Sequence, residues 1–157
     1  TEVVLRAYRD SDYAAAFRIR ELVDPEQQAR FAKRMATSGE WDEHYLHLAV
    51  EHEGCLVGDV QLRRCASTVP EGALEIGIDI DPHRRGLGLG TAALQASTQR
   101  MFAEGAHRIS GSTAEENVAM RRAFVKAGWH FEGVLKALFI ENGLPMDYYS
   151  YATTKFA

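Results

Sequence analysis

The chain has 157 residues, of which 46% are hydrophobic and 25% charged, and its formal net charge is −4. This length is enough for one domain with a hydrophobic core and argues against two, so we expect residues 1–157 to form a single domain. The negative charge disfavours a nucleic-acid surface, and no apolar run reaches the roughly 18 residues of a membrane span. Without a basic and then apolar leader pattern, the default expectation is a cytoplasmic protein that binds neither nucleic acid nor membrane.

The hydrophobic pattern predicts a single mixed α/β domain. In chain order, its elements are a strand at 3–8, a helix ending near Leu22, a helix at about 26–37, strands at 45–52, 55–63 and 74–80, a helix at 90–104, a strand at 107–113, a helix between Asn117 and Gly128, and a last hairpin of strands within 129–140 and 146–155. Asp10 or Ser11 is expected to cap the first helix and Asn117 to cap the last. Asn142-Gly143 is typical of a two-residue hairpin turn.

Three histidines and two cysteines need to be considered as metal ligands. No carboxylate or cysteine completes a set around His44, His47 and His52, so we interpret them as solvated side chains and expect no metal. Cys55 and Cys65 lie ten residues apart on one probable strand. Strand rise would separate them by roughly 33 Å, so we expect reduced thiols and no disulfide.

The stretch His83–Thr91, HRRGLGLGT, follows a predicted strand and opens a predicted helix. Glycines on alternate positions let successive backbone N–H groups point at one spot, and the helix N-terminus adds its positive dipole end. This predicts a cradle for a phosphate or pyrophosphate, with a flexible glycine turn as the alternative. The Walker A loop is excluded because no Gly-Lys-Ser/Thr follows, and the Gly-x-Gly-x-Gly order does not fit the dinucleotide fingerprint.

This loop resembles the acyl-CoA loop of the GNAT N-acetyltransferases, Gln/Arg-x-x-Gly-x-Gly/Ala. Arg85, Gly88 and Gly90 occupy its three fixed positions. The resemblance implies a mixed, mostly antiparallel sheet of about seven strands with a splayed central pair, flanked by about four helices.

A second motif narrows the resemblance to the branch that acetylates the N-termini of ribosomal proteins. Its pattern of Asn, a small residue or Met, then Lys-x-Gly-aromatic is met by Asn117, Met120, Lys126 and the pair Gly128-Trp129. Glu132-Gly133-Val134 follows as in that branch, and Asp147 is similar to an acidic residue common there. Together the two motifs make the chain similar to this superfamily over nearly its whole length.

The resemblance also implies which residues bind acyl-CoA in the gap between the splayed strands. By position they are Ile78, Asp79, Ile80, Arg85, Gly86, Leu87, Gly88, Leu89, Gly90, Thr91 and Asn117. The first three would bond the pantetheine arm through their backbone, and the loop would hold the pyrophosphate. Asn117 would contact the arm, cap its helix, or do both.

The expected activity is transfer of an acetyl group from acetyl-CoA to a primary amine, either a protein N-terminus or a small molecule. Glu75 is the candidate general base, with a solvated or salt-bridged strand carboxylate as the alternative, and Asp79 is the weaker candidate. At pH 7 an α-amine of pKa about 8 is neutral roughly one time in ten, whereas a lysine is neutral about one time in 2,500. Weak base machinery therefore favours α-amines or other amines of low pKa.

The sequence departs from the superfamily on the leaving-group side. Many members carry a tyrosine seven residues after the asparagine, where this chain has Phe124, and some members of the branch carry a serine where this chain has Met120. We therefore assign no general acid, although Tyr148, Tyr149 and Tyr151 are candidates to replace it.

Two alternatives stay open: a non-catalytic acyl-CoA-binding or regulatory domain, and a transferase of a longer acyl group such as succinyl. The acceptor, and whether the chain forms a homodimer, are open as well.

Overall fold

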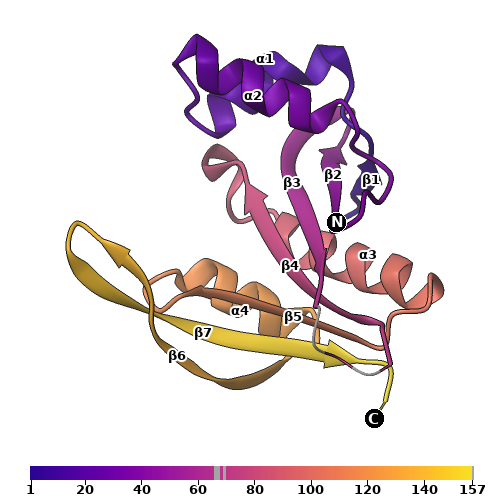
Figure 1. The fold of residues 1–157 in the computed structure, drawn as a ribbon, viewed down its shortest axis with the longest axis vertical. Coiled ribbons are helices and arrows are strands. Elements are labelled where there is room, and N and C mark those ends of the chain that lie inside the picture. Colours follow the sequence, from indigo (N-terminus) through magenta and orange to yellow (C-terminus); the bar gives the residue numbers. More distant parts are fainter. Residues whose placement is uncertain (66–67, 69, 157) are drawn as a thin grey trace.

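The computed structural model describes residues 1–65, 68 and 70–156, and places seven strands and four α-helices among them (Figure 1). The strands are β1 (Val4–Arg6), β2 (Tyr45–His52), β3 (Cys55–Arg64), β4 (Ala73–Ile80), β5 (Arg108–Ala114), β6 (His130–Glu141) and β7 (Leu144–Thr154). The helices are α1 (Tyr13–Ile19), α2 (Pro25–Met35), α3 (Leu89–Ala103) and α4 (Val118–Lys126). The order of elements is the predicted one.

The strands form one sheet in the order β1-β2-β3-β4-β5-β7-β6, in which only β4 and β5 run parallel. Their ladder is short: it begins at Ala73 and Arg108 and ends at Ile76 and Gly111. Beyond this point β4 stays paired with β3 as far as Ile80, while β5 stays paired with β7. The two central strands therefore diverge, and the expected splayed pair is confirmed.

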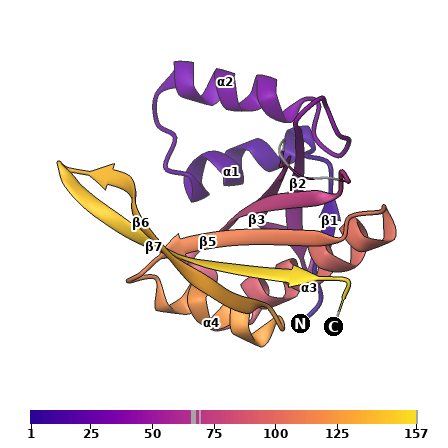
Figure 2. The same cartoon turned by 60° about the horizontal axis from the view of Figure 1, so that its bottom comes forward.

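Helices cover both faces of the sheet, and Figure 2 shows α1 and α2 on one side with α3 and α4 on the other. Side chains of β2 alternate between the two layers. Leu48 and Val50 pack in the core beneath α3 and α4, whereas Ala49 packs beneath α1 and α2. The larger core is centred on Leu62, Leu94 and other fully buried side chains. The central strands β4 and β5 contribute buried residues to the α3–α4 layer, whereas the sheet residues of the α1–α2 layer come from β2 and β3.

The predicted start of α1 is wrong in detail. Neither Asp10 nor Ser11 caps it; both lie in a short 3-10 turn that precedes Tyr13. The buried carboxylate next in line, Asp12, accepts two hydrogen bonds from Arg6 and one from the Arg9 backbone N–H. Burial opposes the charge of Asp12, but the bonds from Arg6, the Arg9 N–H and the charges of both arginines together outweigh it and lower the pKa of this carboxyl. The first strand is also shorter than predicted, because the chain turns after Arg6 to make these contacts.

The last hairpin has the predicted turn, since Asn142 and Gly143 both have positive φ, 51° and 76°. Its outer strand β6 is interrupted near Ala137, which has a φ of 50°. Asp147 on β7 explains how this bend is held: its carboxylate accepts the Ala137 N–H at 2.9 Å and the Lys136 ammonium at 3.0 Å. The acidic residue at 147, which resemblance alone had singled out, therefore shapes the projecting arm of the hairpin.

Among the described residues, no helix has both the length and the apolar character needed to cross a membrane.

Candidate active site

The glycine loop forms a row of free backbone donors at the start of α3. Gly86 and Gly88 have φ of 79° and 73°, and Gly88 is the residue that precedes the helix. Within the described part of the chain, the N–H groups of residues 85–91 donate no hydrogen bond, since the first such bond of the helix runs from Ala92 to Gly88. A left-handed glycine turn leading into a helix N-terminus is suited to hold an anion.

The third glycine of the loop acts differently from the expectation. Gly90 lies inside α3 and does not have a positive φ. A Cβ built on it would lie 3.5 Å from the Ala123 Cβ and 3.9 Å from the Met120 Sδ, both on α4. Both distances are ordinary van der Waals contacts, so the packing of α4 does not require a glycine here, and the turn itself depends on Gly86 and Gly88.

Asp81 anchors the loop to the rest of the protein, a role that sequence reasoning missed. It is 2% exposed, and its carboxylate accepts the His83 N–H at 3.0 Å. Its own N–H bonds to the Val57 carbonyl, and the guanidinium groups of Arg18 and Arg84 lie 3.7 and 3.8 Å away. The sequence signal for this anchor was an aspartate directly before a proline at the end of a strand. This pair was interpreted only as the end of the strand.

The point where β4 and β5 separate is filled by aromatic rings. A Cβ on Gly111 would lie 2.8 Å from the Ile76 Cγ2 and 3.0 Å from the Phe124 Cζ, so only glycine leaves room for them. Phe124 is 1% exposed and stacks on Tyr151, with ring centroids 4.8 Å apart and planes 6° from parallel. Phe124 therefore supports the vertex of the opening by packing, and it offers no proton there.

The other residues expected to meet acyl-CoA lie on the edges of this opening. Ile78, Asp79 and Ile80 pair with β3 on one side and have no β5 partner on the other. Asn117 precedes α4, and its side-chain oxygen accepts the Met120 N–H at 3.2 Å. The predicted cap is thus confirmed, and the amide nitrogen donates no hydrogen bond to the described residues.

Glu75, the candidate base, lies beside the closed part of the ladder and not beyond it. It is paired with Ser110 on β5, and its carboxylate forms a 2.7 Å ion pair with Arg63 on β3. About half of each side chain is exposed. The salt-bridged alternative is therefore realised in this structure.

A cluster of charged groups on the α1 side of the opening was not predicted. Asp59 on β3 lies opposite Asp79 on β4, and Arg20, directly after α1, contacts both carboxylates. Tyr8 completes the cluster by donating its hydroxyl to Asp59 at 2.9 Å. The missed signal was Asp59 itself, because a charge inside the apolar run Leu56–Val60 needs a buried partner.

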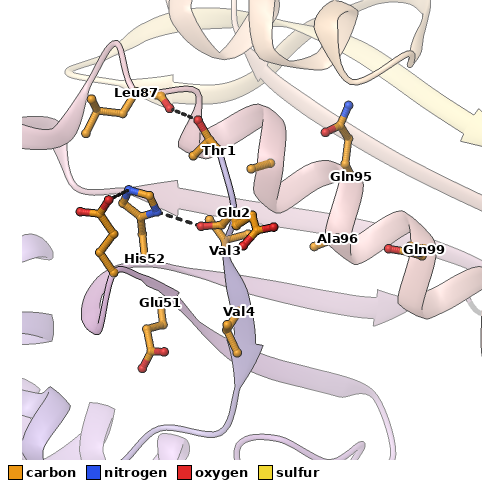
Figure 3. Close-up of a pocket in the computed structure, with 12 residues that line it drawn as sticks. Thr1, Glu2, Val3, Val4, Glu51, His52, Leu87, Gln95, Ala96 and Gln99 are labelled. Atoms are coloured by element: carbon orange, nitrogen blue, oxygen red, sulfur yellow. Dashed lines mark hydrogen bonds and ion pairs between the residues drawn. The ribbon is translucent and has the colours of Figure 1, made fainter.

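A wide, open hollow lies on the other side of the loop, between the N-terminal segment, the β2–β3 turn and α3 (Figure 3). Thr1 donates its hydroxyl to the Leu87 carbonyl at 2.7 Å, and the His52 Nδ1 lies 2.8 Å from the Glu2 carbonyl. The lining includes neither Glu75 nor Asn117. We therefore assign the candidate active site to the strand opening.

The interpretation of the histidines holds in part. His44 is exposed, but His47 and His52 are half-buried and so are not solvated as expected. Burial lowers the pKa of His47, because it penalises the charged ring. In the described ranges no group of three or more His, Cys, Asp or Glu side chains is arranged to hold a metal ion, and both cysteines are free thiols.

The sequence matches the family model described as "Acetyltransferase (GNAT) domain" over residues 2–130. None of the curated proteins compared with the sequence matches it.

Solved structures of acetyltransferases share the fold over nearly the whole chain. RimJ of Mycobacterium smegmatis, in complex with CoA-disulfide, is 24% identical with a TM-score of 0.78, covering 98% of this chain and 82% of that chain. A spermidine N-acetyltransferase SpeG chimera from Vibrio cholerae and hSSAT is 20% identical with a TM-score of 0.76, covering 99% and 96%. A ribosomal-protein-alanine N-acetyltransferase from Brucella melitensis is 18% identical with a TM-score of 0.75, covering 96% and 99%. The expected fold is confirmed by these likenesses.

Proposed function

Because this chain belongs to the family of GNAT acetyltransferase domains, we propose that it transfers an acetyl group from acetyl-CoA to a primary amine. One observation carries the proposal: the unpaired edge of β4 leads directly into the row of free N–H groups at residues 85–91. A long donor with a diphosphate at one end and a thioester at the other fits such a continuous path. The loop holds the diphosphate, and the strand edge orients the arm.

The reacting end of this path lies at the vertex beside Ile76 and Gly111. Backbone groups on the free edge of Gly77 and Ile78 are placed to bond the arm and to stabilise the oxyanion that forms when the amine attacks the thioester. Glu75 takes the proton from the amine, directly or through a water. The sulfur leaves as a thiolate. The pKa of the corresponding thiol is about 8.5, so the thiolate can leave with help from a backbone N–H or water.

The side from which the amine attacks follows from which face of the sheet is exposed at the vertex. Phe124 and Tyr151 fill the α4 face at the vertex, whereas Glu75 is half exposed on the α1 face. We therefore propose that the acceptor enters from the α1 face. We also propose a cytoplasmic site of action, in keeping with the two free thiols.

A non-catalytic acyl-CoA-binding domain is the second candidate, favoured by the buried phenylalanine at 124. The test mixes the protein with acetyl-CoA and a panel of amines and follows free thiol. The proposal expects thiol release that depends on both protein and amine. Tight binding of acetyl-CoA with no amine-dependent release would favour the second candidate, and a larger thermal shift with succinyl-CoA would indicate a longer donor.

A further inference from the structure

Asp79 and Asp59 occupy paired positions of the β3–β4 ladder but have different surroundings. Their Cα atoms are direct partners, so the two carboxylates lie on the same face of the sheet. The Asp59 side chain is 11% exposed, whereas the Asp79 side chain is 67% exposed. Only the outer carboxylate is free to meet a ligand.

The bonds of Arg20 are divided unequally between the two aspartates. Its Nε and Nη2 atoms lie 2.9 and 2.5 Å from Asp59 Oδ2, but Nη2 is 3.5 Å from the nearer oxygen of Asp79. Tyr8 donates only to Asp59, and burial, followed by the Asp59 charge, raises the pKa of Tyr8, so it stays neutral. One negative charge is therefore left over, and it lies on Asp79.

Asp79 also faces the open side of the vertex. Ile76 belongs to the core layer beneath α3 and α4, and alternation places Asp79, three residues further along β4, on the opposite face. That face is the one from which Arg20 approaches. The segment carrying Asp79 is the part of β4 that has lost its β5 partner.

The other side of the opening carries an apolar wall on the same face. Tyr151 packs in the core layer, so Tyr148, three residues earlier on β7, lies on the α1 face. Tyr148 pairs with Ala114, the last residue of β5, and its ring centroid is 4.9 Å from that of Phe139 on β6. Leu135, the partner of Tyr148 in the β6–β7 ladder, and Phe139 are 39% and 53% exposed.

We propose that Asp79 and the wall formed by Leu135, Phe139 and Tyr148 select the acceptor as an amine with a single ammonium group next to an apolar substituent. The inference rests on the proposed function and names its substrate class. The free carboxylate on one edge receives the cationic amine before it is deprotonated, and the apolar group lies on the hairpin on the other edge. Acidic acceptors are repelled by Asp79, and the further charges of a polycation would find no partner in the wall itself, which carries no charge.

Asp79 is assigned to substrate binding, and Glu75 keeps the role of base. The two roles are distinguished by distance from the vertex. Glu75 is paired with β5 at the vertex, whereas Asp79 lies three residues beyond the last β4–β5 pair. Loss of a binding residue raises KM, whereas loss of a base lowers kcat.

The experiment measures acetyl transfer to 2-phenylethylamine, ethylamine, spermidine and a peptide with an acidic first residue. We expect the highest kcat/KM for 2-phenylethylamine, by about tenfold over ethylamine, since an apolar group of this size gains at least that much on burial. Asp79→Asn should raise the KM for 2-phenylethylamine about tenfold, with kcat changed less than about threefold and acetyl-CoA affinity unchanged. Phe139→Ser should lower kcat/KM more for 2-phenylethylamine than for ethylamine.

The matched control is Glu71→Gln, which removes an exposed carboxylate just before β4, at the closed end of the β4–β5 ladder. It should leave all constants unchanged. A preference for spermidine or for the acidic peptide, or an unchanged KM in Asp79→Asn, would overturn the inference.

Failure of the proposed function is distinguishable from failure of this inference. If no amine releases thiol, binding of 2-phenylethylamine is followed by NMR titration of the protein with and without CoA. Weaker binding to Asp79→Asn than to the unaltered protein supports the acceptor site even without turnover. Equal binding to both proteins refutes it.

Discussion

Ile76 and Gly111 are the last paired residues of the β4–β5 ladder, and the Phe124 ring fills the space that a side chain on Gly111 would occupy. The opening in the sheet therefore has a fixed vertex. From this point one edge leads along β4 to the glycine loop, and the other leads along β5 to the apolar hairpin.

Gly111→Ala should destabilise the protein by about 1 to 3 kcal/mol, because the new methyl group overpacks the vertex against Ile76 and Phe124. Urea unfolding measures the change. Gly77→Ala is the matched control on the facing strand, since the nearest atom to its Cβ would be the Gln61 Oε1 at 3.8 Å. Equal stability of the two variants would contradict the packing described for the vertex.

Gly86→Ala should weaken acetyl-CoA binding in calorimetry. The residue has a φ of 79°, and alanine adopts such a conformation at a cost of about 1 to 2 kcal/mol, so the loop relaxes away from its shape. Gly105→Ala imposes similar strain beyond the other end of α3, where φ is 107° and nothing lies within 4 Å of the added Cβ. Both variants should lose stability, and only Gly86→Ala should lose affinity. The assignment of the loop fails if both variants bind acetyl-CoA equally well.

Glu75→Gln should lower kcat on the order of a hundredfold if the carboxylate takes the proton from the amine. Arg63→Gln breaks the same ion pair but keeps the carboxylate, so its kcat should stay much closer to that of the unaltered protein. Each change should cost less than about 1 kcal/mol of stability, because the pair is half exposed. Similar losses of kcat in both variants would show that the ion pair matters and the base does not.

Asp79→Asn should raise the melting temperature at pH 7. Although the Asp79 side chain is 67% exposed, the protein packed around its carboxyl partly desolvates it, and this desolvation, followed by the Asp59 charge, raises the pKa of Asp79 in the folded protein against the opposing effect of Arg20. A carboxyl with a higher pKa when folded than when unfolded destabilises the fold once it is ionised, so its effect grows as pH rises through that window. The advantage of the asparagine should therefore shrink as pH falls through the unfolded pKa of about 3.9 and vanish below about pH 3, where both states are protonated. A lower melting temperature for the variant at pH 7 would contradict this account.

Local sequence patterns predicted the turns and caps that depend on residues adjacent in the chain. The left-handed turn at Gly88, the cap at Asn117 and the turn at Asn142 each follow from one residue type at one backbone position. The splayed strands were expected from resemblance, since no local pattern states where two distant strands part.

The charged cluster could not be predicted in the same way. Arg20 and Asp79 are 59 residues apart in sequence and meet only because the β3–β4 register and the end of α1 bring them together. The assignment of Gly90 to the turn was wrong because α3 already begins at Leu89, so Gly90 has helical backbone. Contacts between distant elements decide which side chains at the opening are free to bind a ligand.

Titration of ¹⁵N-labelled protein with CoA tests most directly whether the backbone of this loop holds a diphosphate. The largest amide shifts should fall on residues 85–91, followed by the free edge of β4 at residues 78–80. Small shifts are expected at Gly105, at the far end of α3. If CoA fails to bind, or binds while leaving the amides of residues 85–91 unmoved, the active site assigned to the strand opening is wrong.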